Sequence, residues 1–420
     1  MRIIFLESKK ALTSPIIIGL LLLFTAWNLF IIFDSSSFNR ELSIINKIAG
    51  DFGVKITDGS LSRLNEELKM ELSQLNAITK KQTGKTFKDT DDFFRQLTYE
   101  NQDTYTSELQ RSFNDLSIKQ MYLQQAESFD KRYEAINIQK IGEGQIAGYH
   151  LSGSAAEMLR KEYSKLADRF EQLKKRKEYK SWFFAGKPFA MHSLLFRTIF
   201  LHILIESLIL IVLSTALISN FEFENRTQLV AFSSKRGRKL MTDKLFSSFI
   251  TSTTIFFILL AATLGPYFTV FDYSHLWSSS INSGLNWEFQ LPYLSWWNFS
   301  LLEYMILAIV VSYICMLLFM LFVFSLSVVL KNSYYTFILF AVIFIALFIL
   351  AGFIPGSSIL FIISNYNLST LFLNPHQWWM ASSGLMMFKY YEVDTLAAWT
   401  IIYAIGCYAA LKTFSKQDIS

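Results

Sequence analysis

Six long apolar segments dominate the pattern of hydrophobic and polar positions along the chain. Crossing the hydrocarbon core of a bilayer takes roughly 20 helical residues, and each segment is about that long or longer. We therefore predict an all-α polytopic membrane protein with six transmembrane helices, at residues 15–33, 193–219, 246–271, 301–330, 334–355 and 394–413.

The charges between these segments predict how the chain is oriented. The segment 272–300 contains no Lys or Arg, and 356–393 contains only Lys389. Basic residues gather elsewhere, near the N-terminus, in the connector 220–245, in the short turn 331–333 and near the C-terminal end: Arg2, Lys9, Lys10, Arg226, Lys235, Arg236, Arg238, Lys239, Lys244, Lys331, Lys412 and Lys416. Because basic short loops stay on the cytoplasmic side, we expect both termini (1–14 and 414–420) and the connector to be cytoplasmic.

The same rule places 34–192, 272–300 and 356–393 on the outer side of the membrane. One basic run, "KKRKEYK" at 174–180, points the other way. Long translocated domains largely escape the charge rule, so this run does not reverse the prediction.

The segment 34–192 is expected to be a helical extracytoplasmic domain, a stalk with a head. Leucine and isoleucine recur at spacings of three and four over 61–78, and large apolar residues do the same over 159–173, which is typical of amphipathic helices. The simplest packing is an antiparallel pair of these two helices, with 89–135 as further helices on top. The glycine-rich stretch 140–154 is expected to be a turn region. The apolar segment 356–393 is broken by Asn, Pro and Gly, which favours re-entrant or interfacial helices.

No catalytic constellation is present in the sequence. "TGKT" at 83–86 lacks the glycine at position 79 that a phosphate-binding loop requires. The five histidines are scattered, and the two cysteines lie inside predicted spans, so neither a zinc site nor a disulfide framework is expected. The net charge of +5 needs no nucleic-acid partner, because positive loops orient a membrane protein. We expect no enzyme activity and no cofactor or metal in this chain.

Ionisable residues inside the second span are candidates for function. His202 and Glu206 are four residues apart and therefore lie on one helix face. An unpaired carboxylate near mid-span is costly, so Glu206 should face protein or water. These residues either form a polar element of a translocation path or make an interhelical hydrogen bond.

The connector 220–245 combines basic residues with an amphipathic pattern. "FEFENRTQLVAF" at 221–232 can form a short helix with Phe223, Leu229, Val230 and Phe232 on one face and Glu222, Glu224, Arg226 and Gln228 on the other. A loop beside anionic lipid headgroups would explain the Lys and Arg residues, but it would not explain the two glutamates or the amphipathic pattern.

Together with the six spans, "ENRTQLVAFSSKRGRKLMTDKL" resembles the ABC-2 type permeases, which are membrane subunits of ABC transporters. Their pattern is an acidic residue, a short cytoplasmic helix, a basic "GR" turn and a Lys that opens the next span. Glu224, Thr227, Gly237, Arg238 and Lys244 match it, whereas Arg226 stands where relatives often have glycine. The resemblance also covers 1–14, which is similar to the amphipathic elbow helix of the family, and it leaves out 34–192.

This resemblance implies the permease subunit of a bacterial ABC exporter in the cytoplasmic membrane. Lipid would surround the chain, and a second permease chain, identical or paralogous, would complete the path. A separate ATPase subunit would bind ATP and Mg²⁺ and dock on the connector. The cargo would be an amphipathic peptide, an antibiotic or a lipid-like molecule. The implied coupling residues are Glu222, Phe223, Glu224, Thr227, Leu229, Phe232, Gly237, Arg238 and Lys244.

A second interpretation is a membrane-anchored sensor. In that case the outer helical domain binds a peptide or envelope ligand, and the connector contacts a cytoplasmic partner without any transport. Six spans exceed what an anchor requires, which favours the exporter.

Overall fold

The computed structural model describes residues 2–186, 193–234, 236–288, 291–382 and 384–416. Lys235 of the connector and most of the tail 414–420 lie outside these residues. The fold is built almost wholly from helices, and a single pair of two-residue strands is present in the described part of the chain. This confirms the prediction of a helical polytopic membrane protein.

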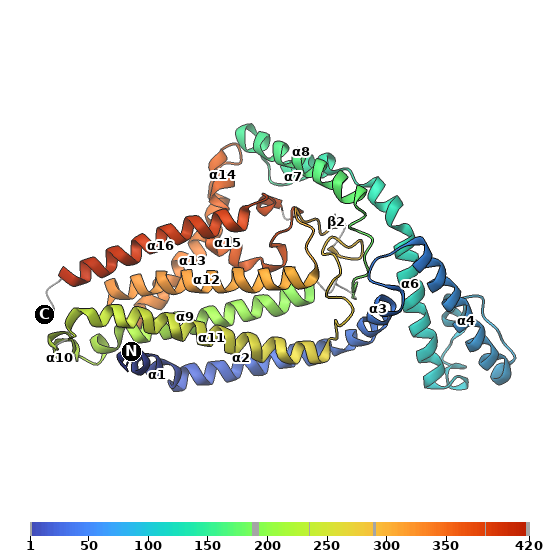
Figure 1. Ribbon diagram of the computed structural model, residues 1–420, viewed down its shortest axis with the longest axis horizontal. Helices are drawn as coiled ribbons and strands as arrows, with labels where there is room; N and C mark the ends of the chain where they lie inside the picture. Colours follow the sequence, from blue (N-terminus) through green and yellow to red (C-terminus); the bar gives the residue numbers. More distant parts are fainter. Residues whose placement is uncertain (1, 187–192, 235, 289–290, 383, 417–420) are drawn as a thin grey trace.

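Six helices among the described residues are long and apolar enough to cross a membrane. They are Pro15–Phe52, Leu194–Glu224, Gly237–Val270, Leu301–Leu330, Ser333–Phe353 and Tyr391–Lys416. They correspond to the six predicted segments, with differences at their ends. Figure 1 shows them side by side, with both termini at one end of the bundle and most of the segment 34–192 at the other. We call these the connector end and the domain end.

The helix α9 (Phe200–Glu224) lies at the centre of the bundle. It packs against α2 (Pro15–Asp34), α11 (Leu240–Val270), α12 (Leu301–Leu330) and α13 (Ser333–Ile349). The helix α16 (Tyr391–Lys416) packs along α12. A π-helix, η3 (Ser193–Ile199), leads into α9.

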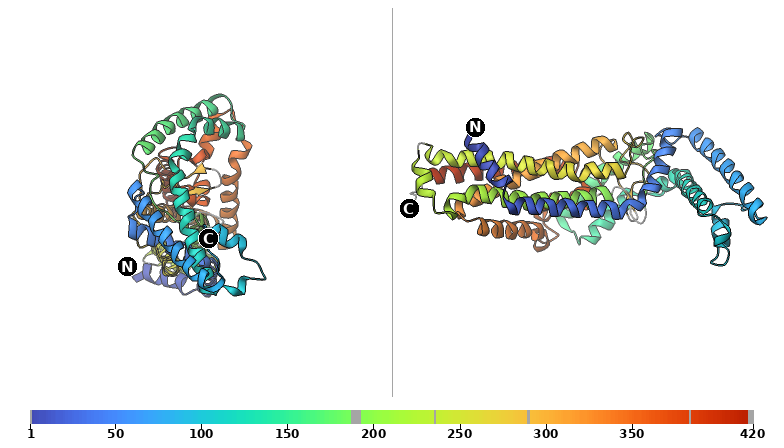
Figure 2. Two further views of the ribbon diagram at one scale, coloured as in Figure 1. Left: turned by 90° about the vertical axis from the view of Figure 1, so that its right-hand side faces the viewer. Right: turned by 90° about the horizontal axis from the view of Figure 1, so that it is seen from below.

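The first membrane helix continues beyond the predicted span. α2 passes through a 3-10 turn, η1 (Ser35–Phe38), directly into α3 (Asn39–Phe52). At 1.5 Å per residue, the extra length carries the chain past the bundle toward the domain end, as Figure 2 shows. The boundary predicted at residue 34 therefore lies inside one helical rod.

The segment 53–186 forms two helical pairs rather than one pair with the helices of 89–135 on top of it. α4 (Asp58–Thr83) packs along α6 (Ser107–Ala135), with α5 (Thr90–Gln96) and η2 (Gln102–Thr104) between them in sequence. α8 (Gly153–Lys175) packs along α7 (Ile138–Gly148). The predicted pairing of 61–78 with 159–173 is wrong, because an amphipathic stripe shows that a helix has a partner without showing which one.

The two pairs occupy different places. Figures 1 and 2 show α4 and α6 as an arm that projects beyond the domain end, whereas α8 lies over the bundle with its first residues beside α14 (Ile359–Ser364). An aromatic cluster holds the tip of the arm, where the rings of Phe93 and Phe113 stack at 3.8 Å.

The glycine-rich stretch 140–154 is mostly helical, contrary to the predicted turn. α7 contains Gly142, Gly144 and Gly148, and the turn is confined to the few residues before α8. A Cβ atom at Gly142 would lie 2.6 Å from the ring of Tyr163 on α8, whereas one at Gly144 would meet nothing within 4 Å. Gly142 is thus required for close helix packing rather than for a turn.

Substitution of these two glycines should have opposite effects. Gly142→Ala should destabilise the protein by about 1–3 kcal/mol because the methyl group overpacks the α7–α8 contact. Gly144→Ala should stabilise it by up to about 1 kcal/mol through helix propensity. Chemical unfolding of the purified protein in detergent measures both, and equal effects of the two changes would contradict this packing.

Irregular segments cover the domain end of the bundle. They include β1 (Trp287–Glu288) paired antiparallel with β2 (Leu291–Pro292). They also include the interrupted segment before α16, made of η5 (Leu350–Phe353), α14, α15 (Leu368–Leu373), η6 (Pro375–Gln377) and η7 (Gly384–Met386).

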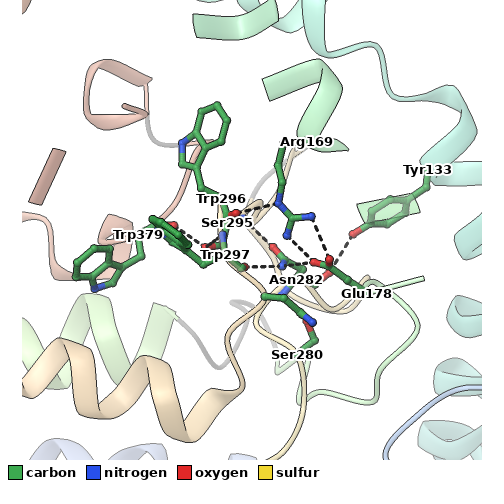
Figure 3. A network of polar contacts seen from close by, with 10 residues as sticks. Tyr133, Arg169, Glu178, Ser280, Asn282, Ser295, Trp296, Trp297 and Trp379 are labelled. Atoms are coloured by element: carbon green, nitrogen blue, oxygen red, sulfur yellow. Dashed lines mark hydrogen bonds and ion pairs between the residues drawn. The ribbon is translucent and has the colours of Figure 1, made fainter. Parts of the chain in front are cut away.

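A buried polar network ties these segments to α8 (Figure 3). Arg169 donates two hydrogen bonds to Glu178, at 3.0 and 2.6 Å. The Asn282 amide donates to the same carboxylate at 3.0 Å and accepts from the Ser295 N–H at 2.7 Å. Ser295 Oγ then donates to the Trp379 carbonyl at 2.7 Å. Because hydrogen bonds link each of these residues to the next, the network rigidifies the junction between the inserted segment and the bundle.

Candidate functional site

The described residues of the connector include the end of α9, two short helical segments and the start of α11. After α9 ends at Glu224, the chain turns at Arg226, which has a left-handed φ of 55°. α10 (Gln228–Ser233) and the 3-10 turn η4 (Gly237–Lys239) follow. The Thr227 N–H bonds back to the Glu222 carbonyl at 2.8 Å and closes the turn. The predicted helix over 221–232 is therefore divided at 225–227.

A buried ion cluster fastens the base of the connector. Lys244 is fully buried on α11, where its ammonium pairs with Glu222 at the end of α9 and donates to the Ile218 carbonyl. Glu7 of the N-terminal helix α1 (Arg2–Leu12) lies 3.9 Å from the same ammonium and pairs with Lys10 at 2.7 Å. Two cations thus balance two carboxylates, as buried charges require.

Aromatic packing holds α10 against the bundle. The Phe232 ring lies 5.7 Å from Phe223 and 5.2 Å from Phe414 of α16, and Phe232 is buried. Leu229 and Val230, in contrast, are 58% and 77% exposed. The structure therefore does not place Phe223, Leu229 and Phe232 on one free face. The two phenylalanines contact their own chain, and the exposed apolar pair is Leu229 and Val230.

Other predicted coupling residues attach the connector to neighbouring helices. Glu224 accepts a hydrogen bond from the Ser333 N–H at the start of α13, at 2.6 Å. Arg238 donates to the Ser415 carbonyl of α16 at 2.7 Å. Gly237 has a φ of 55°, which favours glycine. A displacement of the connector would therefore exert force on four helices at once, namely α9, α11, α13 and α16.

Next to η4, Arg236 and Asp243 form an ion pair that holds the turn against the first residues of α11. The hydrogen-bonded carboxylate of Asp243 raises the pKa of Arg236 above its ordinary value. Asp243 is buried, so this pair neutralises a carboxylate that would otherwise be costly to bury.

A second polar cluster lies inside the bundle. The Asn28 amide of α2 donates to Glu206 Oε2 of α9 at 2.7 Å and to Thr263 Oγ1 of α11 at 3.0 Å. All three residues are buried. His202 is not part of this cluster: within the part of the chain that the structure describes, its Nδ1 atom is buried without a hydrogen-bond partner. The arrangement gives Glu206 an interhelical partner, the second of the two roles considered for it.

Polar side chains continue from this cluster toward the connector along the α9–α11 contact. Small residues there let the two helices approach closely. Their buried polar atoms lack hydrogen-bond partners within the described residues: Ser207, Thr215, Ser219 and Asn220 on α9, and Ser248, Thr251 and Ser252 on α11.

Sequence reasoning missed Glu7 and Asn28. Asn28 could have been found, because it is the strongest hydrogen-bonding side chain in an otherwise apolar first span. Glu7 gave a weaker signal, since a glutamate in an amphipathic terminal helix is usually solvated. Among the described residues, no group of three or more His, Cys, Asp or Glu side chains is placed to hold a metal ion.

Glu206→Leu should destabilise the protein by about 1–3 kcal/mol, because the buried Asn28 amide loses its carboxylate acceptor. Glu206→Gln retains a carbonyl acceptor and should cost clearly less. Unfolding of both purified variants measures the difference. If leucine is tolerated as well as glutamine, the hydrogen bond contributes nothing to stability.

Comparison with known proteins identifies no relative: no protein-family model, no curated protein and no solved structure matches this chain.

Proposed function

We propose that this chain is the permease subunit of an ATP-driven ABC exporter in the bacterial cytoplasmic membrane. A separate ATPase subunit binds ATP and Mg²⁺ and docks on the connector, and the transported molecule is an amphipathic peptide, an antibiotic or a lipid-like compound. The observation that carries the proposal is the exposed Leu229–Val230 pair on α10, a helix whose base is fastened to the bundle by the Glu7–Glu222–Lys244 cluster.

The exposed pair supports a protein partner because helix-in-groove recognition rests on a few apolar anchors. The fastened base supports transmission of force, because α9 and α11, which flank α10 in the chain, are joined there to each other and to α1. A loop that only touched lipid headgroups would need the basic residues but neither the buried ion cluster nor the contacts to α13 and α16.

Six membrane helices form half of such a transporter, so a second permease chain, identical or paralogous, completes the path. In this proposal ATP-driven closure of the ATPase pair pushes α10 and tilts α9. His202 and Glu206 on α9 would then move relative to α2 and α11.

A membrane-anchored sensor is the second candidate function. It is favoured by a cleft of about 330 Å³ in the projecting arm, between α4, α5 and α6, lined by polar residues that include Lys69, Asp91, Gln120 and Gln124. A peptide or envelope ligand could bind there without any transport.

Co-purification from the native host separates the two functions. Affinity-tagged chain, extracted in mild detergent, should bring down a protein that carries nucleotide-binding motifs, and the complex should hydrolyse ATP. Recovery of a signalling partner without such a subunit would favour the sensor.

The proposed orientation predicts which positions are accessible from outside. A cysteine at the exposed position Ser107 should react with a membrane-impermeant thiol reagent on wall-free cells, whereas one at the exposed position Ser233 should react only after lysis. The native Cys315 and Cys407 are buried, which keeps the background low. The reverse labelling pattern would invert the topology.

A further inference from the structure

A cavity of about 570 Å³ opens at the domain end of the bundle, far from the connector and next to the base of the arm, where α4 begins. Four short stretches of the chain form its walls: residues 54–57 after α3, residues 176–181 after α8, residues 278–280, and residues 298–303 around the start of α12. Residues 176–180 belong to the basic run at 174–180, whose charge is unexpected on the outer side of the membrane.

The cavity carries uncompensated positive charge. Lys180, one of four cations in its lining, is 2.7 Å from Asp130 and lowers the pKa of that carboxyl group. The other three, Lys55, Arg176 and Lys177, are exposed. They make no ion pair or side-chain hydrogen bond with the residues that the structure describes, although Lys177 also lowers the pKa of Asp130 through its charge.

The two carboxylates in the lining are already engaged. Glu178 is buried in its pair with Arg169 and also accepts from Asn282. Glu303 caps α12 by accepting from the N–H and the hydroxyl of Ser300, at 2.8 and 2.9 Å. Among the charged lining residues, three exposed cations therefore outnumber the one solvated carboxylate, Glu303. The rest of the wall combines hydroxyl and amide groups of Ser278, Ser280 and Asn298 with apolar side chains.

The walls are held in place before any ligand binds. Lys55 and Ser181 form a β-bridge, flanked by backbone hydrogen bonds from Ile56 to Lys180 at 3.1 Å and from Trp182 to Val54 at 2.9 Å. Lys177 adopts a left-handed φ of 53°, and the network of Figure 3 fixes the adjoining Glu178. A pre-organised site loses little free energy to ordering when it binds a ligand.

The cavity lies at the end of a membrane-spanning helix, where lipid headgroups are expected. It opens beside Ser300, where α12 begins, and the Leu302 N–H bonds to the carbonyl of the half-buried Trp277. Tryptophan gathers at the interface between membrane and water. Arginine, lysine and hydroxyl donors together are the groups that bind phosphate.

We propose that this cavity binds a phosphate group, carried by an anionic lipid headgroup or by a free phosphate compound. Phosphate in the cavity balances Lys55, Arg176 and Lys177 and receives hydrogen bonds from the hydroxyl and amide wall. In this proposal the basic run at 174–180 contributes to ligand binding.

The proposal is tested by measuring how much phosphatidylglycerol binds to the full-length chain. The protein is placed in nanodiscs of phosphatidylcholine that contain some phosphatidylglycerol, and native mass spectrometry counts the bound lipids. The variant Lys55→Gln/Arg176→Gln/Lys177→Gln should bind at least about tenfold more weakly, because each charge-assisted hydrogen bond contributes substantially. The matched control, Lys85→Gln/Lys140→Gln/Lys161→Gln, removes three exposed lysines elsewhere on the segment 53–186 and should bind like wild type. Glu303→Gln, which preserves the capping pattern, should bind more tightly.

Inorganic phosphate added as a competitor distinguishes the two sources. Displacement of the lipid shows that the phosphate group alone is recognised, and retention shows that the membrane-bound headgroup is required. The two triple variants should have equal unfolding midpoints. A loss of binding in the cavity variant then results from the lost charge and not from lost stability. Equal binding by wild type and the cavity variant, to both lipid and inorganic phosphate, would overturn the proposal.

Discussion

Lys244→Met is expected to lower the free energy of unfolding by about 3–5 kcal/mol, because it leaves a buried carboxylate without its cation. Lys244 is fully buried, and its ammonium neutralises Glu222 and lies near Glu7. Chemical unfolding of the detergent-purified protein measures the loss.

Two further variants define the cause of this loss. Lys239→Met removes an exposed lysine from the same segment and should change stability by no more than about 0.5 kcal/mol. Lys244→Met/Glu222→Gln removes both charges, leaves Glu7 with Lys10, and should recover much of the lost stability. If the single Lys244 variant is as stable as the Lys239 variant, the cluster does not hold the connector.

Leu229→Asp/Val230→Asp should weaken binding of the proposed ATPase subunit by roughly a hundredfold or more. Anchor residues of an interface often contribute ~2 kcal/mol each, and every 1.4 kcal/mol changes affinity about tenfold. Both side chains are exposed, so the variant should insert and fold normally. Quantitative co-purification of the ATPase with each permease variant measures the effect.

The matched control is Ser233→Asp/Ser234→Asp, which adds the same charge to exposed positions at the end of α10. It should retain most of the ATPase binding. Phe232→Asp is unsuitable as a binding test, because Phe232 packs on Phe414 within the chain and its loss would disturb the fold. Equal losses in the two double variants would mean that charge alone, and not the apolar pair, determines binding.

The membrane helices could be predicted from the sequence because hydrocarbon imposes a length and a composition on each of them. Glu206 could be flagged for the same reason, since a carboxylate is costly at that depth. Its partner Asn28 could have been proposed from its position in the first span. No local pattern, however, shows that Asn28 also reaches Thr263.

Features that depend on packing between distant segments could not be predicted. The amphipathic helix α4 could have paired with α8 by pattern alone, yet it pairs with α6. The glycines around Gly142 favoured a turn. The local sequence does not show that Gly142 is required for its close contact with Tyr163 on another helix. Phe232 was predicted to be an exposed anchor for a partner protein. Its contact with Phe414 could not be foreseen, because the two residues are far apart in the chain.

The central claim is that α10 contacts an ATPase subunit, and site-specific photo-cross-linking tests it most directly. A photoreactive residue at Leu229, in tagged chain expressed in the native host, should form an adduct with a protein that contains nucleotide-binding motifs. The same probe at Ser107, at the other end of the molecule, should form none. Adducts at Leu229 with lipid only, or with no nucleotide-binding protein, would contradict the account.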